Sequence, residues 1–231
     1  MVGEHRFNDA SDLADRLSER IAEGLRAALT VRGAASLIVS GGKTPQALFQ
    51  RLARAPLDWG QVWIGLADER WVGTGEAASN ERFVREHLLV SEAAAARFIG
   101  MKNAAADPVL GAASTWNAYK RIPRPFDFVL LGMGDDGHTA SLFPGSPALQ
   151  SALDLHSAPA CVAMVAPVDP CSRLSLNLPA LTDTREIIIA STGESKWRVF
   201  RAACAAGSEL EYPVRAILRQ DRAPVDFFWA P

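Results

Sequence analysis

Residues 35–49 read ASLIVSGGKTPQALF, an apolar run followed by a glycine-rich turn and then by a helical stretch. The run Ala35–Val39 has the length of a strand and does not alternate with polar residues, which is typical of a strand covered on both faces. A helix is predicted over 45–54, beginning near Pro45. The stretch therefore predicts a strand, a short loop and a helix, the repeating unit of an α/β fold.

The same order of elements recurs on both sides of this stretch. An amphipathic helix is predicted over 9–29, where leucine and isoleucine recur one turn apart. Further helices are predicted over 79–89, 107–121 and 194–206. The other predicted strands are Val62–Ala67, Phe126–Leu131, Cys161–Val165, Glu186–Ala190 and Val225–Trp229. This alternation predicts a doubly wound, mostly parallel sheet with helices on both faces, and the lack of repeats or linkers predicts one domain over 1–231.

The composition excludes several classes of protein. With 24 basic and 26 acidic residues the formal charge is −2, which argues against a nucleic-acid or membrane-surface partner but allows a local basic pocket for a small anion. No apolar run approaches the roughly 20 residues that span a bilayer, and the polar N-terminus is not a signal peptide. Three cysteines without C-x-x-C spacing, Cys161, Cys171 and Cys204, are expected to be buried thiols in a reducing, cytoplasmic compartment.

The loop after the first buried strand, SGGKTP (40–45), is a candidate phosphate site. Gly41 and Gly42 allow backbone N–H groups to approach an anion, and the following helix adds a favourable dipole. Thr44 can donate a hydroxyl. The loop resembles the end of a P-loop, but Leu37 stands where that motif needs a glycine, so a monophosphate fits better than a triphosphate. A simple strand–helix turn is the alternative.

A second polar segment, ADERWV (67–72), follows the next strand, with SNER at 79–82. Three adjacent charges after a strand are costly unless they face a cleft or each other. One interpretation is a solvated strand end. The other places Arg70 near a charged ligand and Asp68 at substrate hydroxyls, with Ser79 a helix cap.

The third loop lies in FDFVLLGMGDDGHT (126–139). Its glycines spell G-x-G-x-x-G, but Asp135 and Asp136 would repel the pyrophosphate of a dinucleotide. The segment is better interpreted as a turn that presents one carboxylate and one imidazole. Acid–base chemistry near neutral pH suits the imidazole of His138, which a neighbouring carboxylate can orient. A lone histidine is more often structural, which is the alternative here.

Two further cations are weaker candidates. Arg173 could bind an anion or pair locally. Lys196 lies in the first turn of a predicted helix, where a cation opposes the dipole and suggests an anionic ligand. No second histidine lies at metal-ligand spacing from His138, and no G-x-S-x-G or H-E-x-x-H motif occurs, so neither a metal site nor a nucleophile elbow is predicted.

Taken together, these loops resemble those of the 6-phosphogluconolactonase family, whose members have a fold of the sugar-phosphate isomerase type. The matching stretches, in the family's order, are SGGKTP (40–45), DERWV (68–72), SNERF (79–83), LLGMGDDGHTASLFPGS (130–146), SRLSLNLPAL (172–181) and STGESK (191–196). The string DGHTASLFPG is highly specific. The resemblance covers about residues 36–196, most of the chain.

The resemblance implies hydrolysis of 6-phospho-D-glucono-1,5-lactone to 6-phospho-D-gluconate in the oxidative pentose phosphate pathway. His138 would take a proton from the attacking water, and Asp136 would orient His138 or contact substrate. Substrate and phosphate binding is implied for Gly41, Gly42, Lys43, Thr44, Asp68, Arg70, Asn80, Gly134, Arg173 and Lys196. Neither cofactor nor metal is expected, since a lactone is an activated ester. The partner is expected to be this small molecule, and the protein a monomer or weak homo-oligomer.

Two other functions stay open. Glucosamine-6-phosphate deaminases share the phosphate loop and the D-G-H segment, but they place a ring-opening glutamate where Phe143 stands here, and a tyrosine where Arg70 stands. The missing glutamate favours the lactonase. A non-catalytic sugar-phosphate sensor is the other alternative, and the intact His138 and Asp136 argue against it.

Overall fold

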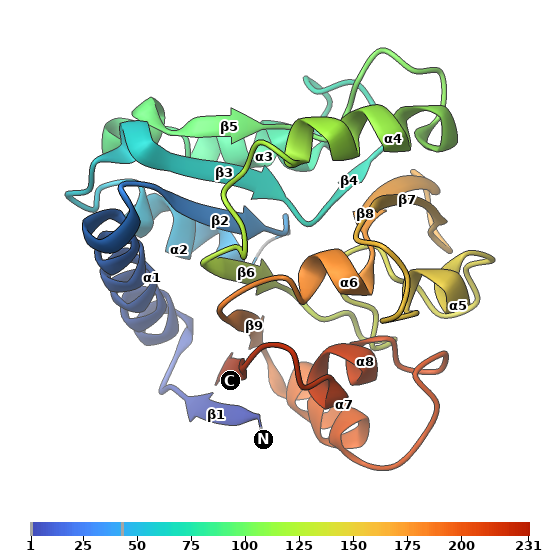
Figure 1. Ribbon diagram of the computed structural model, residues 1–231. Coiled ribbons are helices and arrows are strands. Elements are labelled where there is room, and N and C mark those ends of the chain that lie inside the picture. Colours follow the sequence, from blue (N-terminus) through green and yellow to red (C-terminus); the bar gives the residue numbers. More distant parts are fainter. Residues whose placement is uncertain (1, 43) are drawn as a thin grey trace.

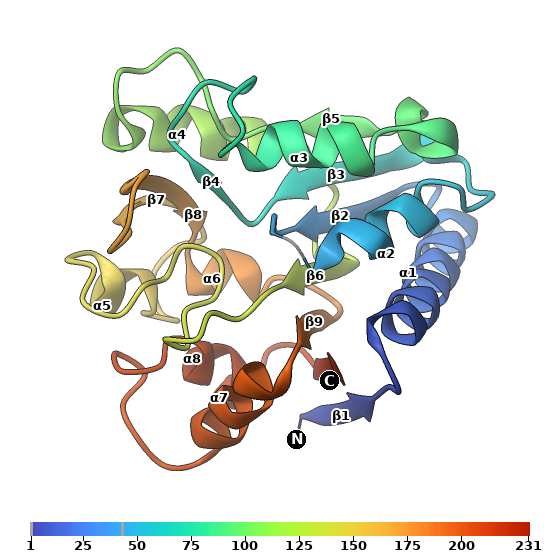
Figure 2. The ribbon, with the colours of Figure 1, turned by 180° about the vertical axis from the view of Figure 1, so that it is seen from behind.

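The computed structural model describes residues 2–42 and 44–231, so Lys43, a predicted phosphate-binding residue, lies outside the described residues. The predicted α/β architecture is confirmed: a seven-stranded parallel sheet lies between helices, and a three-stranded antiparallel sheet stands beside it (Figures 1 and 2). The large sheet has the order β1 (Gly3–Arg6), β10 (Val225–Ala230), β9 (Ile187–Thr192), β6 (Phe128–Leu131), β2 (Ala35–Val39), β3 (Val62–Leu66) and β5 (Arg97–Ile99).

The three central strands bring their carboxyl ends to one edge. β6 pairs with β2 on one side, with Leu130 opposite Val39, and with β9 on the other, with Leu131 opposite Ile189. Every residue of β2 and β6 is buried, as their unbroken apolar sequences predict. The loops that follow these strands therefore meet at the same edge, where ligands of open α/β sheets bind.

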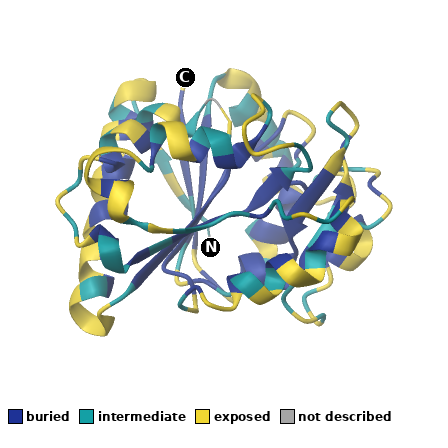
Figure 3. Cartoon of the chain, turned by 90° about the horizontal axis from the view of Figure 1, so that it is seen from above, coloured by how far each residue is buried: buried dark blue, intermediate teal, exposed yellow. Residues whose placement is uncertain are grey.

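Helices cover both faces of this sheet. The α-helices of the described residues are α1 (Ala10–Arg32), α2 (Pro45–Leu52), α3 (Asn80–His87), α4 (Pro108–Tyr119), α5 (Leu149–Ala152), α6 (Leu178–Leu181), α7 (Glu194–Cys204) and α8 (Val214–Arg219). Helices α2 and α3 stand in front of the sheet in Figure 2, and α4 stands in front of it in Figure 1. Viewed from above, the strands are buried between helices whose outer sides are exposed (Figure 3). No helix of the described residues is long and apolar enough to cross a membrane.

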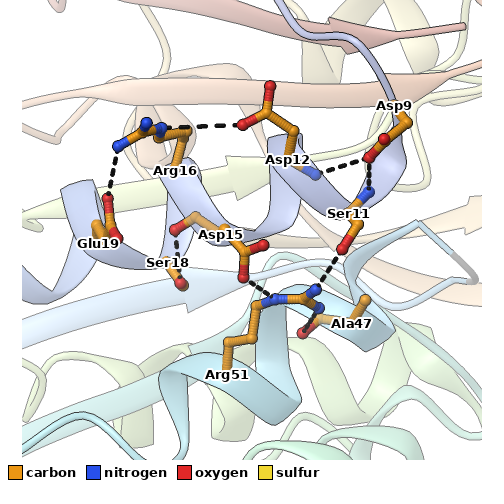
Figure 4. Close-up of polar contacts among 9 residues, drawn as sticks. All are labelled: Asp9, Ser11, Asp12, Asp15, Arg16, Ser18, Glu19, Ala47 and Arg51. Carbon is orange, nitrogen blue, oxygen red and sulfur yellow. Dashed lines mark hydrogen bonds and ion pairs between the residues drawn. The ribbon is translucent and has the colours of Figure 1, made fainter.

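Helix α2 is fixed against α1 through Arg51, which matters because α2 directly follows the 40–44 loop (Figure 4). The Arg51 guanidinium pairs with Asp15 and donates to the Ser11 hydroxyl at 2.8 Å and to the Ala47 carbonyl at 3.1 Å. Asp9 caps α1 by accepting from two backbone N–H groups of its first turn. The Arg51 contacts therefore tie α2 to the first turns of α1.

The small sheet differs most from the expectation. Cys161–Val165 is the strand β7, as predicted, but it pairs antiparallel with β8 (Ser172–Leu176) and lies outside the parallel sheet. β8 also pairs antiparallel with β4 (Asp68–Arg70). Helix α4 covers β7, yet Val165 is exposed. The sequence predicts a polar loop where the short, charged β4 lies, because three residues give no periodicity.

The cysteine expectation was wrong in part. All three thiols are free, but only Cys161 is buried, whereas Cys171 is half-buried and Cys204 is exposed. Cys204 is the last residue of α7, and Cys171 immediately precedes β8. Residues at the ends of elements need not pack into the core, so these two thiols keep contact with solvent.

Candidate active site

A cleft of about 360 Å³ opens at the carboxyl edge of the parallel sheet, between this sheet and the small one. It is lined by ten predicted site residues: Gly41, Gly42, Thr44, Asp68, Arg70, Asn80, Gly134, His138, Arg173 and Lys196. Asp136 is outside the lining but contacts His138. The structure thus brings together segments as distant in the sequence as Gly41 and Lys196.

The loop after β6 folds tightly around His138. The Gly134 N–H donates to the His138 carbonyl at 2.8 Å, and the Gly137 N–H donates to the Gly134 carbonyl at 3.1 Å. A Cβ on Gly134 would overlap the His138 ring and the Asp136 carboxylate. Gly137 has a φ of 73°, in the left-handed region that glycine tolerates. The glycines of the G-x-G-x-x-G string therefore allow the turn to close under the imidazole.

His138 and Asp136 form a hydrogen-bonded pair. Nδ1 of His138 lies 2.5 Å from Oδ1 of Asp136, and the backbone N–H of His138 donates to the same oxygen at 3.1 Å. Partial burial acts to raise the pKa of Asp136, but the bond and charge of His138 outweigh it and lower this pKa below its ordinary value. On its other side the imidazole packs against the Phe143 ring, with centroids 4.3 Å apart. The ring is thus fixed by a carboxylate and an aromatic neighbour.

Gly41 lies close to Asn80. A Cβ on Gly41 would overlap the Asn80 side-chain amide, and Gly42 has a φ of 115°, which favours glycine. Thr44 stands at the N-terminus of α2, and its side chain makes no capping hydrogen bond. Its hydroxyl is therefore available to a ligand in the cleft.

Asp68 is buried in a hydrogen-bond network. Ser141 donates its hydroxyl to Oδ2 of Asp68 at 2.6 Å. Asn80 donates its amide to the Asp68 backbone carbonyl at 2.8 Å and more weakly to Oδ1 at 3.4 Å. Because Asp68 begins β4 only two residues after the end of β3, and Asn80 begins α3, this network ties the parallel sheet, the small sheet and α3 together at the cleft wall.

Glu69, between the two predicted ligand residues, has a structural place. Its carboxylate accepts from the backbone N–H groups of Arg70, Asn80 and Glu81, each at 2.7 Å, and from the Ser79 hydroxyl at 3.0 Å. Burial raises the pKa of Glu69, although these four bonds act in the opposite direction. The carboxylate holds the N-terminus of α3, and Ser79 caps this helix as predicted.

Arg70 and Arg173 place two like charges side by side. They are directly opposite each other on β4 and β8, and no acidic side chain of the described residues lies within 4.0 Å of either guanidinium. Arg70 donates to the Ala78 carbonyl at 2.6 Å, and the Nε atoms of both arginines are buried without a partner. Burial, followed by repulsion from Arg70, lowers the pKa of Arg173. Arg70 is half-buried and Arg173 is buried, and two neighbouring guanidinium groups without a paired carboxylate are suited to bind an anion.

Lys196 differs from the arginines because it already has a counter-ion. Its Nζ lies 3.0 Å from Oδ1 of Asp135, in the loop after β6. The hydrogen bond from Lys196 lowers the pKa of Asp135. Lys196 does lie in the first turn of α7, as predicted, but the negative group that offsets it in the structure is Asp135.

Comparison with known proteins defines the family. A family model described as glucosamine-6-phosphate isomerases/6-phosphogluconolactonase matches residues 8–229. The chain belongs to this family.

Individual relatives show which members of this family the chain resembles. A 6-phosphogluconolactonase of Pseudomonas putida is 42% identical over 227 residues, covering 98% of this chain and 92% of the relative. Another, of Pseudomonas aeruginosa, is 43% identical and covers 100% of this chain and 95% of the relative. The crystal structure of a 6-phosphogluconolactonase from Shewanella baltica has a TM-score of 0.96 at 43% identity, covering 100% of this chain and 98% of that chain. The resemblance to 6-phosphogluconolactonases is confirmed, and the chain is an enzyme of this family.

Sequence reasoning missed several residues of the enzyme's cleft: Ser40, Met133, Ala140, Val168 and Ser191. Ser40 directly follows a predicted strand and Ser191 directly follows the expected end of another, so their position was the signal that could have found them. Val168 lies in the loop between β7 and β8, which gave no signal because β8 was not predicted.

No three His, Cys, Asp or Glu side chains come together as a metal site would require, within the part of the chain that the structure describes. The expectation that the enzyme needs neither metal nor organic cofactor stays a prediction.

Proposed function

We propose that this enzyme hydrolyses 6-phospho-D-glucono-1,5-lactone to 6-phospho-D-gluconate in the oxidative pentose phosphate pathway. One observation carries the proposal: a histidine–carboxylate pair and two arginines without counter-ions line or adjoin a single cleft. The pair offers a base for water, and the arginines offer a site for the phosphate. The names of the relatives support the same substrate.

In the proposed reaction His138 is the general base. Because the Asp136 carboxylate accepts the hydrogen bond at Nδ1, this nitrogen carries the proton and leaves a lone pair on Nε2. Nε2 takes a proton from water as the water oxygen attacks the lactone carbonyl carbon. The resulting imidazolium lies beside the Asp136 carboxylate, which stabilises its charge.

The ring opens when the tetrahedral intermediate collapses. The bond between the carbonyl carbon and the ring oxygen breaks, and the imidazolium of His138 returns the proton to this departing oxygen. The new carboxylic acid ionises in water, so the product carries one more negative charge than the substrate. Both partners of the pair end in their starting protonation states.

The phosphate is proposed to lie against the small sheet. Arg70 and Arg173 lack counter-ions and supply charge-assisted donors, while Gly41, Gly42 and Thr44 line the same cleft next to the N-terminus of α2. Lys196 is proposed to leave Asp135 and bind the same dianion. Phosphate binding at one end would position the lactone carbonyl against His138 at the other.

A deaminase is the second candidate, and Phe143 argues against it. Phe143 is 6% exposed and packs on the His138 ring, so no carboxylate stands at that position to open an amino-sugar ring. A sensor without activity would have no use for the hydrogen-bonded imidazole in the cleft.

The test is the rate of 6-phosphogluconolactone consumption by purified enzyme near pH 7, measured against spontaneous hydrolysis. Glucosamine 6-phosphate serves as the second substrate, with ammonia release as the readout. Rapid lactone consumption without ammonia supports the proposal. Ammonia release without lactone consumption would overturn it in favour of a deaminase, and inertness toward both would favour a sensor.

A further inference from the structure

Unpartnered polar atoms concentrate at the cleft. Within residues 2–42 and 44–231, six buried side-chain nitrogen or oxygen atoms lack a hydrogen-bond partner: Ser40 Oγ, Arg70 Nε, Trp71 Nε1, Arg173 Nε, Ser191 Oγ and Arg215 Nε. Four of these six belong to residues that line the cleft. Buried polar groups in native proteins are nearly always satisfied, so such a group at a ligand site is expected to find its partner in the ligand.

Among the four cleft-lining residues with an unpartnered atom, Ser191 is the one that no step of the proposed reaction uses. The arginines belong to the proposed phosphate site, and Ser40 opens the phosphate loop. Ser191 is 2% exposed and lies near the carboxyl end of β9, in register with Trp229 of β10. β9 is also the direct neighbour of β6, whose following loop carries His138.

Other fully buried serines show that the missing partner is unusual here. Ser36 donates to the Pro123 carbonyl at 3.0 Å and accepts from the Asp127 N–H at 3.1 Å. Ser141 donates to Asp68, and Ser175 donates to the Leu176 carbonyl at 3.0 Å. Ser191 alone among these four leaves its hydroxyl unused in the described structure.

We propose that Ser191 is a substrate-binding residue whose hydroxyl forms a hydrogen bond with an oxygen of the bound sugar phosphate. This inference rests on the proposed function and adds a residue to it. Serine has three staggered rotamers about one bond, so Oγ can turn toward a ligand oxygen without backbone movement. A hydroxyl both donates and accepts, which suits a sugar hydroxyl as well as a phosphate oxygen.

The experiment combines Ser191→Ala with two substrates and one control. kcat/KM is measured for 6-phosphogluconolactone and for glucono-1,5-lactone, which lacks the phosphate, and Tm is measured for the free protein. Ser191→Ala is expected to lower kcat/KM for the phosphorylated lactone by about threefold to tenfold, the value of one neutral hydrogen bond. An equal loss on both lactones assigns the bond to the sugar ring, and a loss on the phosphorylated lactone alone assigns it to the phosphate.

The Tm of the free protein distinguishes a substrate-binding role of Ser191 from a structural role. Because the Ser191 hydroxyl has no partner in the free protein, Ser191→Ala is expected to keep or raise Tm. The matched control Ser36→Ala removes a satisfied hydroxyl at the opposite end of the sheet, so it is expected to lower Tm and to leave kcat/KM unchanged.

Two results would overturn the inference. One is an unchanged kcat/KM for both lactones in Ser191→Ala. The other is a fall in Tm as large as that of Ser36→Ala, which would mean that the hydroxyl is bonded within the fold. Both are distinct from failure of the proposed function, in which the wild-type enzyme itself would not hydrolyse 6-phosphogluconolactone.

Discussion

Arg70 and Arg173 are directly opposed on two antiparallel strands, although they are more than 100 residues apart in the chain. Like charges at such a pair destabilise a sheet. Here the cost is increased by burial, since Arg173 is 5% exposed and its pKa is lowered by burial and by Arg70. The phosphate of the proposed substrate would offset this cost by binding between the two side chains.

Replacing Arg173 by methionine is expected to remove much of the phosphate recognition. Charge-assisted hydrogen bonds are worth about 1.5–3 kcal/mol, so kcat/KM for 6-phosphogluconolactone should fall by roughly 10- to 150-fold. Hydrolysis of glucono-1,5-lactone should be almost unchanged. The free variant should be at least as stable as the wild type because one buried like charge is gone.

The control for this prediction is Arg215, another buried arginine. It lies outside the cleft lining and pairs with Glu211 at 2.6 Å. Arg215→Met should lower Tm and leave the ratio of kcat/KM for the two lactones intact. If Arg173→Met slowed both lactones equally, Arg173 would act on the lactone group or the fold instead of the phosphate.

Asp136→Asn should lower kcat by roughly 10²- to 10³-fold with little change in KM, since an amide can favour the wrong imidazole tautomer and does not stabilise the imidazolium. The lowered pKa of Asp136 keeps its carboxylate ionised at pH 5, so the orienting bond should persist there. It should be lost only as the pH falls below the ordinary value of 3.8. The kcat of the two proteins near pH 7 checks the first expectation, and a carbon-13 NMR titration of the Asp136 carboxylate in the wild type checks the second.

Asp135→Asn is the matched control, because it changes the neighbouring carboxylate. Asp135 contacts Lys196 and not the imidazole, so its loss should alter KM for the phosphorylated lactone more than kcat. Equal effects of the two substitutions on kcat would refute a specific role for Asp136.

Cys161 should make the protein sensitive to alkali. Burial raises the pKa of its thiol to about 12, from an ordinary value of 9.0. Above pH 9 the unfolded thiol ionises while the folded one stays protonated, so the free energy of unfolding falls as pH rises toward 12. Between pH 8 and pH 10 the free energy of unfolding, measured with urea, should fall by about 1.4 kcal/mol more in the wild type than in Cys161→Ala. The same pH dependence in both proteins would be the contrary result.

The sequence predicted the parallel sheet because its strands are apolar throughout and are separated by helices. It predicted the His138 turn because glycines, a carboxylate and an imidazole stand together after a strand. The small sheet was only partly predictable: β4 has three charged residues, and its partner β8 lies 100 residues away. The Arg70–Arg173 pair depends on this pairing, so its geometry could not be derived from local patterns.

The ion pair of Lys196 with Asp135 also escaped the sequence analysis. The helix dipole predicts an anionic ligand for Lys196, whereas in the structure Lys196 pairs with Asp135, the carboxylate next to Asp136. That partner comes from the loop after β6, and Lys196 comes from the helix after β9. Only the adjacency of these two strands in the sheet reveals the contact.

The central claim is that His138 activates water against the lactone. The most direct measurement is kcat for 6-phosphogluconolactone hydrolysis by the wild type and by His138→Ala, with exposed His156→Ala as the control for loss of a histidine. His138→Ala is predicted to lose roughly 10²- to 10⁴-fold in kcat with little change in KM, while His156→Ala stays at the wild-type value. A folded His138→Ala protein with near-normal kcat would contradict the claim.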